Sequence, residues 1–266
     1  MQSYKHLKVK NEGRVKIVTF NRPDQLNALN IEMMNEISDF SFKLNEDGVT
    51  RVVVFTGEGE HFCSGMDLTD KQRIDQHEND NHLMKLRHMK IGPEMIRRLF
   101  EIDQITIAAI NGAAVGGGAC IAAACDFRIG ETDSKIGYPE VKLAMNLSWT
   151  SLPMLVHLVG PVKAKQMVIL AETFDASTMK DWGFLDDVVP GEILMNNVMK
   201  LAKKCASQAP IAAQMVKRSV NAISSALDRA IMHMDSDQFL YATSGKDFEE
   251  GIQAFLEKRK PEFKGD

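Results

Sequence analysis

The sequence predicts an α/β protein whose final part is helical. Up to about residue 146, short apolar runs typical of strands are interleaved with segments of helical spacing. Beyond that point strand signals nearly vanish, while helical spacing continues. A glycine-rich turn also joins an apolar strand to an apolar helix within Ala108–Asp126. These three observations predict a core of strands and helices followed by a helical module.

The first half of the chain alternates between the two kinds of pattern. Residues 4–20 alternate around Asn11-Glu12-Gly13 and predict a β-hairpin. Polar and charged residues fill 70–92, which predicts a mobile, partly helical excursion. The remaining elements expected here are a helix over 31–46, a strand over 51–56, a short helix over 93–104 and strands over 105–110, 126–130 and 135–137.

The second half predicts helices over 147–159, 161–170, 175–181, 191–207, 210–224 and 227–257, the last one broken near Gly245. The last of these carries more apolar residues than the surface of a monomer needs. They either pack on the chain's own core or form contacts between subunits, and we favour the second interpretation. The residues concerned are Met232, Met234, Phe239, Leu240 and Tyr241.

Composition excludes several classes of function. A chain of 266 residues is long enough for one large domain, or one with a small appendage, and its net charge of −4 gives no reason to expect nucleic acid or an anionic membrane as a partner. The polar start has no apolar leader, and no apolar run suits a membrane span. Four cysteines without a CxxC motif favour a reduced, cytoplasmic protein, and the scattered histidines predict no metal site.

The run AAINGAAVGGGACIAAACD at 108–126 is the most informative part of the sequence. Gly116, Gly117 and Gly118 leave no side chains where backbone amides enter a helix N-terminus, which attracts negative charge. A P-loop would need Lys-Ser/Thr after the glycines, and GxGxxG spacing is absent. We therefore favour a site for charge that forms transiently on a carbonyl oxygen. Tight helix–strand packing is the alternative, and it explains one glycine better than three.

Six segments, in order and at matching spacing, resemble the crotonase (enoyl-CoA hydratase/isomerase) superfamily. They are NRPDQLNALN (21–30), FCSGMDL (62–68), AAINGAAVGGGACIAAACDFRIG (108–130), IGYPEVKL (136–143), LVGPVKAKQMVILAETFDASTMKDWGFLDDVVP (158–190) and EEGIQAFLEKRKPEF (249–263). The resemblance implies a right-handed spiral of ββα repeats over 1–195, which would hold an acyl-CoA site. It also implies a helical oligomerisation region over 196–266 that forms homotrimers or hexamers made of two trimers.

The resemblance also implies roles for individual residues. The amides of Met66 and Gly117 would form an oxyanion hole for the thioester carbonyl. Phe255 and Lys258 would reach the nucleotide end of CoA on a neighbouring subunit, although Lys258 lies in a charge run that equally suits a solvated face. Coenzyme A is then part of the substrate, and no separate cofactor is expected. The other implied CoA contacts are Gln25, Leu26, Ala28, Ser64, Asp67 and Leu68.

The implied catalytic group is a single glutamate. Hydratases of this family carry two glutamates, but Cys120 stands at the first of these positions and Glu140 at the second. An aspartate used by dienoyl-CoA isomerases is replaced by Ser148. One carboxylate beside an oxyanion hole is sufficient to move a double bond from C3 to C2 of an enoyl-CoA. An apolar pocket would raise the pKa of that carboxyl toward the working pH.

Other functions remain open at this stage. The main alternative is hydration of a 2-enoyl-CoA, followed by other reactions of CoA thioesters and by a non-catalytic relative that binds CoA esters or RNA. Cys120, Tyr138 and Trp149 are candidates for the acyl pocket. Cys120 suits a small apolar role better than a nucleophilic one, since no histidine partner lies nearby in the sequence. Tyr138 and Trp149 could shape the site or simply pack, and 70–92 would cover the acyl end.

Overall fold

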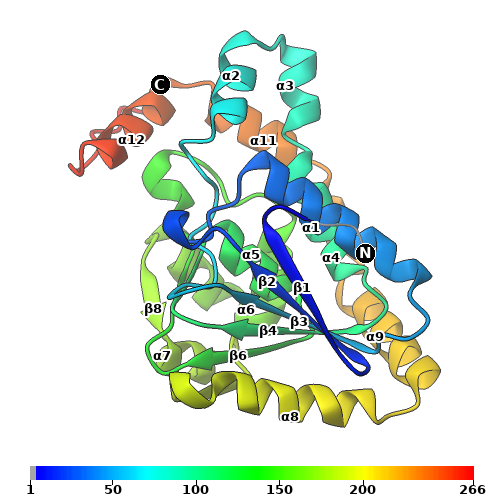
Figure 1. The fold of residues 1–266 in the computed structure, drawn as a ribbon. Helices are drawn as coiled ribbons and strands as arrows, with labels where there is room; N and C mark the ends of the chain where they lie inside the picture. Colours follow the sequence, from blue (N-terminus) through cyan, green and yellow to red (C-terminus); the bar gives the residue numbers. More distant parts are fainter. Residues whose placement is uncertain (1–3) are drawn as a thin grey trace.

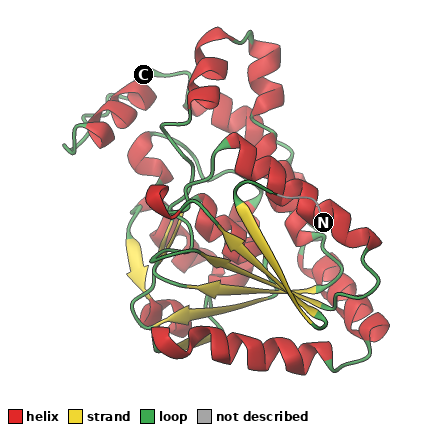
Figure 2. Cartoon of the chain, in the orientation of Figure 1, coloured by secondary structure: helices red, strands yellow, loops and turns green. Residues whose placement is uncertain are grey.

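Two sheets organise the structure, a computed structural model that describes residues 4–266. The larger sheet has six strands in the order β1-β2-β3-β4-β6-β9, and β1 pairs antiparallel with β2 while the other neighbours are parallel. Its strands are β1 (Leu7–Glu12), β2 (Val15–Phe20), β3 (Val52–Gly57), β4 (Ile105–Ile110), β6 (Phe127–Glu131) and β9 (Asp187–Val189). The smaller sheet, in the order β5-β7-β8, contains β5 (Ala113–Val115), β7 (Lys135–Gly137) and β8 (Thr173–Asp175) (Figure 2).

The inner strands of the large sheet, such as β3 and β4, are buried on both faces, which is why they are apolar on both sides. In β3, Val52 and Val54 belong to the apolar cluster beneath helix α8 (Leu194–Ala206), whereas Val53 and Phe55 belong to the main core on the opposite face. The main core also contains residues of α1 (Ile31–Lys43), α4 (Ile91–Phe100) and α5 (Gly117–Ala124). Figure 1 shows α8 along one side of the sheet and α1, α4 and α5 on the other.

The chain repeats a strand–strand–helix unit. After β4 it turns at Asn111-Gly112, enters the small sheet as β5 and continues into α5. After β6 it enters the same small sheet as β7 and continues through a 3-10 turn, η3 (Glu140–Leu143), to α6 (Ser151–Ile169). These repeats confirm the predicted α/β class with ββα units.

The remaining elements complete the order along the chain. They are η1 (Pro23–Gln25), η2 (Leu44–Glu46), α2 (Lys71–Asn79), α3 (His82–His88), α7 (Ala176–Asp181), η4 (Gly191–Ile193), α9 (Pro210–Ser224), α10 (Arg229–Met232), α11 (Asp235–Ala242) and α12 (Lys246–Leu256). No described helix is both long and apolar enough to cross a membrane.

Several boundaries differ from the sequence prediction. The helix expected from residue 147 begins at Ser151, because Trp149 and Thr150 have φ angles of 60° and 58°, which no α-helix allows. The expected break before residue 161 is confirmed, since Gly160 (φ 76°, ψ 164°) interrupts α6. Strands β5, β8 and β9 were not predicted, whereas the equally short β7 was; a strand of three residues shows no reliable period. The 227–257 helix is broken after Met232 and again before Lys246.

The end of the chain folds back over the small-sheet side of the molecule. Helix α12 packs on η3, where a Cβ on Gly251 would lie 2.9 Å from the backbone of Leu143. Helix α11 contacts α3, and Figure 1 shows α2, α3, α11 and α12 gathered at one end of the molecule. Helix α8, which spans the proposed boundary between 195 and 196, lies against the large sheet. The 3-10 turn η3 is therefore covered by the sequence-distant helix α12.

Candidate active site

Two segments far apart in the sequence run side by side at the centre of the site. The amide of Cys63 donates to the carbonyl of Ala113 at 2.9 Å, and the amide of Val115 donates to the carbonyl of Cys63 at 3.0 Å. Gly65 then approaches the next turn so closely that a Cβ there would lie 2.9 Å from the Val115 oxygen and 3.5 Å from the Gly117 nitrogen. The pairing carries Met66 and Gly117 to neighbouring positions at the ends of the two segments.

The amides of Met66 and Gly117 have no hydrogen-bond partner among the residues that the structure describes. Gly117 is the first residue of α5, where a helix leaves its N–H groups unpaired and carries partial positive charge. Both residues line one cavity together with Glu140, and we call it the central cavity. Two free amides at such a position are suited to an oxygen that gains negative charge.

Each of the three consecutive glycines has its own structural reason. Gly116 has φ +52° and ψ −120°, a conformation that L side chains rarely adopt. A Cβ on Gly117 would lie 2.5 Å from the indole of Trp149, and one on Gly118 would overlap the main chain of Cys63. Close packing thus accounts for Gly117 and Gly118, and backbone conformation accounts for Gly116. The sequence interpretation had expected packing to explain only one of the three.

Glu140 lies at the start of η3 and points its carboxyl group toward the same turn. Its Oε1 would be 3.2 Å from a Cβ built on Gly116, and its Oε2 is buried without a hydrogen-bond partner. Burial raises the pKa of the Glu140 carboxyl from 4.5 to about 7. Near neutral pH this group can both accept and release a proton.

Glu140 differs from the other carboxylates that line the central cavity. Asp67 forms an ion pair with Arg22 at 2.9 Å and accepts a hydrogen bond from the Thr69 hydroxyl at 2.7 Å. Asp24 is exposed on η1. Cys120 does line the cavity, but burial, together with the nearby Glu140, raises the pKa of its thiol well above the usual value. A thiolate nucleophile is therefore disfavoured there.

Two loops that the sequence predicts to contact CoA are tied to each other. The amide of Ser64 donates to the Leu26 carbonyl at 3.1 Å, and the amide of Leu29 donates to the Gly65 carbonyl at 2.7 Å. Arg22 adds its ion pair with Asp67 and a hydrogen bond to the carbonyl of Ala28. Arg22 was not predicted as a site residue, although it lies within the segment 21–30 that resembles the family.

The structure gathers most of the predicted site residues around the central cavity but leaves two outside it. Tyr138 is fully buried beneath α5, and its hydroxyl donates to the Ala119 carbonyl at 3.2 Å instead of reaching the cavity or Glu140. Lys258 is exposed after α12 and does not line the cavity of its own chain. Besides Met66, Gly117 and Glu140, the predicted residues that do line it are Gln25, Leu26, Ala28, Ser64, Asp67, Leu68, Cys120, Trp149 and Phe255.

Trp149 forms a wall between the central cavity and a second one. Its indole lies between Gly92 of α4 and Gly117 of α5, where a Cβ on either glycine would collide with the ring. The strained turn at Trp149 and Thr150 is held by a hydrogen bond of 2.6 Å from the Thr150 amide to the buried Asp235 carboxylate. No sequence pattern predicts this contact, because it joins positions 85 residues apart.

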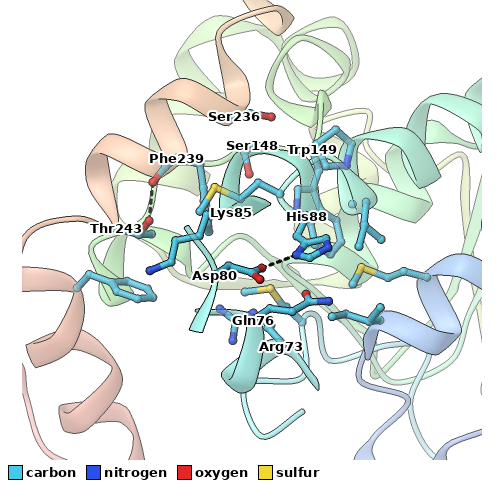
Figure 3. Close-up of a pocket in the computed structure, with 18 residues that line it drawn as sticks. Arg73, Gln76, Asp80, Lys85, His88, Ser148, Trp149, Ser236, Phe239 and Thr243 are labelled. Carbon is cyan, nitrogen blue, oxygen red and sulfur yellow. Dashed lines mark hydrogen bonds and ion pairs between the residues drawn. The ribbon is translucent and has the colours of Figure 1, made fainter. Parts of the chain in front are cut away.

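The second cavity, which we call the distal cavity, is lined by Arg73, Gln76, Asp80, Lys85 and His88 together with apolar residues (Figure 3). It shares Met66, Ser148, Trp149 and Phe239 with the central cavity. Phe239 packs in part against Leu143, Met145 and Phe248 of its own chain, and its contact with a neighbouring subunit stays a prediction. The polar wall comes from α2, α3 and the residue Asp80 between them, all within the segment 70–92 that was predicted to cover the acyl end of the substrate.

Fold and site together define a class of enzyme. A buried carboxyl group with a near-neutral pKa beside two free amides can move a proton next to a carbonyl group while the amides stabilise the resulting oxyanion. Residues 10–266 match the family model for enoyl-CoA hydratase/isomerase. The chain therefore belongs to the enoyl-CoA hydratase/isomerase family, within the crotonase superfamily that the sequence resembled.

Individual relatives span the whole chain. Crotonyl-CoA hydratase of Syntrophomonas wolfei subsp. wolfei is 32% identical over 98% of this chain and 98% of its own. Short-chain-enoyl-CoA hydratase of Clostridium acetobutylicum is 33% identical over 96% of this chain and 95% of its own. The crystal structure of carnitinyl-CoA hydratase from Mycobacterium avium is similar with a TM-score of 0.86 and 30% identity, and the match covers 99% of this chain and 100% of that one.

The buried carboxyl of Glu140 predicts a gain in stability when it is replaced. Because the folded-state pKa is raised from 4.5 to about 7, the ionised group opposes folding, and this cost grows as pH rises through that range. We expect Glu140→Gln to increase the free energy of unfolding at pH 8 by on the order of 1 to 3 kcal/mol. At pH 4.5 the difference from the wild type should largely vanish. Urea unfolding at the two pH values measures it, and equal stability of the two proteins at pH 8 would contradict the burial argument.

Proposed function

We propose that this enzyme isomerises 3-enoyl-CoA thioesters to 2-enoyl-CoA thioesters, with Glu140 as both base and acid. The observation that carries the proposal is the position of Glu140. Among the described carboxyl groups that line the central cavity, it is the one with a buried oxygen, Oε2, that has no hydrogen-bond partner. Cys120 occupies the place where a second glutamate would assist hydration.

The proposed reaction balances with one acid–base group. The thioester oxygen accepts hydrogen bonds from the amides of Met66 and Gly117, and Glu140 removes a proton from C2. The electron pair of the broken C–H bond delocalises over the carbonyl and the C3=C4 double bond as a dienolate. The protonated Glu140 then gives its proton to C4, so that the double bond lies between C2 and C3 and the carboxylate is restored.

Each part of the site contributes to lowering the barrier. Each free amide of such a pair typically contributes on the order of 3 kcal/mol to transition-state stabilisation. A base with a pKa near 7 transfers protons in both directions efficiently at neutral pH. These steps use only protein groups and the thioester itself. We propose that coenzyme A is part of the substrate and is bound by the two loops that carry Gln25, Leu26, Ser64 and Leu68.

Hydration of 2-enoyl-CoA is the second candidate, and the relatives favour it. The proteins of Syntrophomonas and Clostridium described above are named as hydratases. In this reaction Glu140 would activate a water molecule that attacks C3, and the proton lost by that water would return to C2. One glutamate would have to do the work that two divide elsewhere, which is why we place isomerisation first.

We also propose that the enzyme works as a homotrimer or as a hexamer of two trimers. Helix α9 and the residues after it leave a row of apolar side chains in water, which a single chain cannot cover. They are Ile211, Met215, Val216, Val220, Ile223 and Leu227, each more than half exposed. A neighbouring subunit could also bring Phe255 or Lys258 toward bound CoA. The free thiols of Cys63, Cys120, Cys125 and Cys205 fit a cytoplasmic enzyme.

An assay with two substrates separates the candidate reactions. We expect absorbance of the conjugated thioester to appear with a 3-enoyl-CoA and to stay constant with a 2-enoyl-CoA. Glu140→Gln should lower kcat at least about 1,000-fold, since it removes the proton carrier. The wild-type kcat/KM should rise with pH and level off above about 7, where Glu140 is ionised in the free enzyme.

The outcomes of this assay are distinct. Loss of absorbance with the 2-enoyl-CoA would establish hydration and overturn the isomerase assignment. Tight binding of both thioesters without turnover would indicate a non-catalytic CoA-ester-binding protein. The substitution Cys120→Ser tests the thiol directly: we expect isomerisation to persist, because Glu140 and not the thiol moves the proton, and its loss in a folded protein would contradict this assignment.

Charges placed on α9 should disperse the oligomer. We expect Val220→Lys combined with Ile223→Lys to convert trimers or hexamers to monomers, because lysines oppose burial of this face. Sedimentation velocity measures the change, with Val49→Lys as the matched exposed control. If the double variant sediments like the wild type, α9 does not form the subunit interface.

A further inference from the structure

The distal cavity continues from the point where the proposed chemistry takes place. Met66, whose amide faces the central cavity, and the three side chains of Ser148, Trp149 and Phe239 line both cavities. An acyl chain whose thioester lies at Met66 and Gly117 would therefore extend past Trp149 into the distal cavity. Figure 3 shows Ser148, Trp149 and Phe239 on one side of this cavity, with Arg73 and Gln76 on the opposite side.

The wall of the distal cavity has two different parts. Apolar side chains from α1, α4 and the C-terminal helices suit methylene groups; they are Ile31, Met34, Ile91, Pro93, Phe239 and Phe248. The part formed by α2 and α3 carries Arg73, Gln76, Lys85 and His88 instead. A plain alkyl chain would find partners along the first part only.

Arg73 is the key group in the polar part. Its side chain is partly buried, and it forms no hydrogen bond or ion pair with any residue that the structure describes. The nearest acids are already engaged: Asp67 pairs with Arg22, and Asp70 accepts the amides of Ile31 and Gln72. Burial lowers the pKa of the Arg73 guanidinium, while Asp70 and Asp67 oppose that shift, and arginine stays charged at physiological pH.

The other charges of the distal cavity leave an excess of positive charge. Asp80 is bound to His88, with 2.6 Å between Oδ2 and Nδ1, as the dashed line in Figure 3 marks. The half-buried Lys85 forms no ion pair among the described residues. Two cations without partners, next to an amide donor on Gln76, form an arrangement suited to an anion with two oxygens.

We propose that the distal cavity binds a carboxylate at the far end of the acyl chain, so that the enzyme prefers thioesters of dicarboxylic acids over thioesters with a terminal methyl group. Arg73 would hold this carboxylate through paired hydrogen bonds, and Lys85 and Gln76 would assist. The inference rests on the proposed function, because it assumes that the thioester occupies the central cavity. A partly buried guanidinium without a partner is costly, and an ω-carboxylate would supply the missing partner.

Binding and turnover test this inference separately. Saturated acyl-CoA thioesters of equal chain length, one ending in a carboxylate and the other in a methyl group, are titrated calorimetrically into the wild-type protein. We expect the carboxylate form to bind about 10-fold tighter or more. Arg73→Met should abolish this preference, Arg73→Lys should restore part of it, and the exposed Arg87→Met on α3 should leave it unchanged.

Turnover of the two enoyl-CoA thioesters, one ending in a carboxylate and the other in a methyl group, distinguishes failure of the proposed reaction from failure of the ligand assignment. Preference for the carboxylate form without any isomerisation would keep the ligand assignment and overturn the proposed reaction. Isomerisation with equal affinity for both forms would overturn the ligand assignment alone. Thermal unfolding of each variant establishes that it is folded, and a preference that survives Arg73→Met in a folded protein would also contradict the inference.

Discussion

The site depends on the close parallel approach of the segments 62–67 and 113–117. The hydrogen bonds between Cys63 and its partners Ala113 and Val115 fix the register of this pair. Gly65 and Gly118 then allow backbone to meet backbone where side chains would collide. The hydrogen bonding between the two segments ends just before Met66 in one and Gly117 in the other. The amides of these two residues are therefore left free and close together. A shift of either segment by one residue would turn these amides away from the central cavity.

The protein encloses this pair of amides with elements that come late in the chain. Helix α12 covers the turn that carries Glu140, and Asp235 at the start of α11 holds the Trp149–Thr150 turn in its left-handed conformation. Exclusion of water has two consequences that belong together. It strengthens the hydrogen bonds offered to an oxyanion, and it raises the pKa of the Glu140 carboxyl to about 7. The group that destabilises the fold at high pH is thus the group suited to the chemistry.

The sequence revealed the parts of the site that depend on local pattern. The three glycines at 116–118 mark a helix start with free amides, whereas Glu140 was identified through the resemblance to the crotonase superfamily. The roles of Met66 and the CoA loops came from resemblance, since pairing of 62–67 with 113–117 has no local signature. Tyr138 was misplaced because its neighbour Glu140 faces the cavity, whereas the tyrosine ring packs beneath α5. The polar wall of the distal cavity could not be predicted either. In the sequence, Arg73 and Lys85 look like ordinary surface charges, and only the packing of α11 against α3 shows that they line a cavity.

The central claim is that Glu140 removes a proton from C2 of a thioester held by the amides of Met66 and Gly117. The most direct measurement follows exchange of the C2 hydrogens of a saturated acyl-CoA in D2O by NMR, because this step needs neither a double bond nor added water. The account predicts that the wild-type enzyme catalyses the exchange and that Glu140→Gln, still folded and still binding the thioester, does not. Equal exchange by both proteins, or none by a wild-type enzyme that binds the thioester, would contradict it.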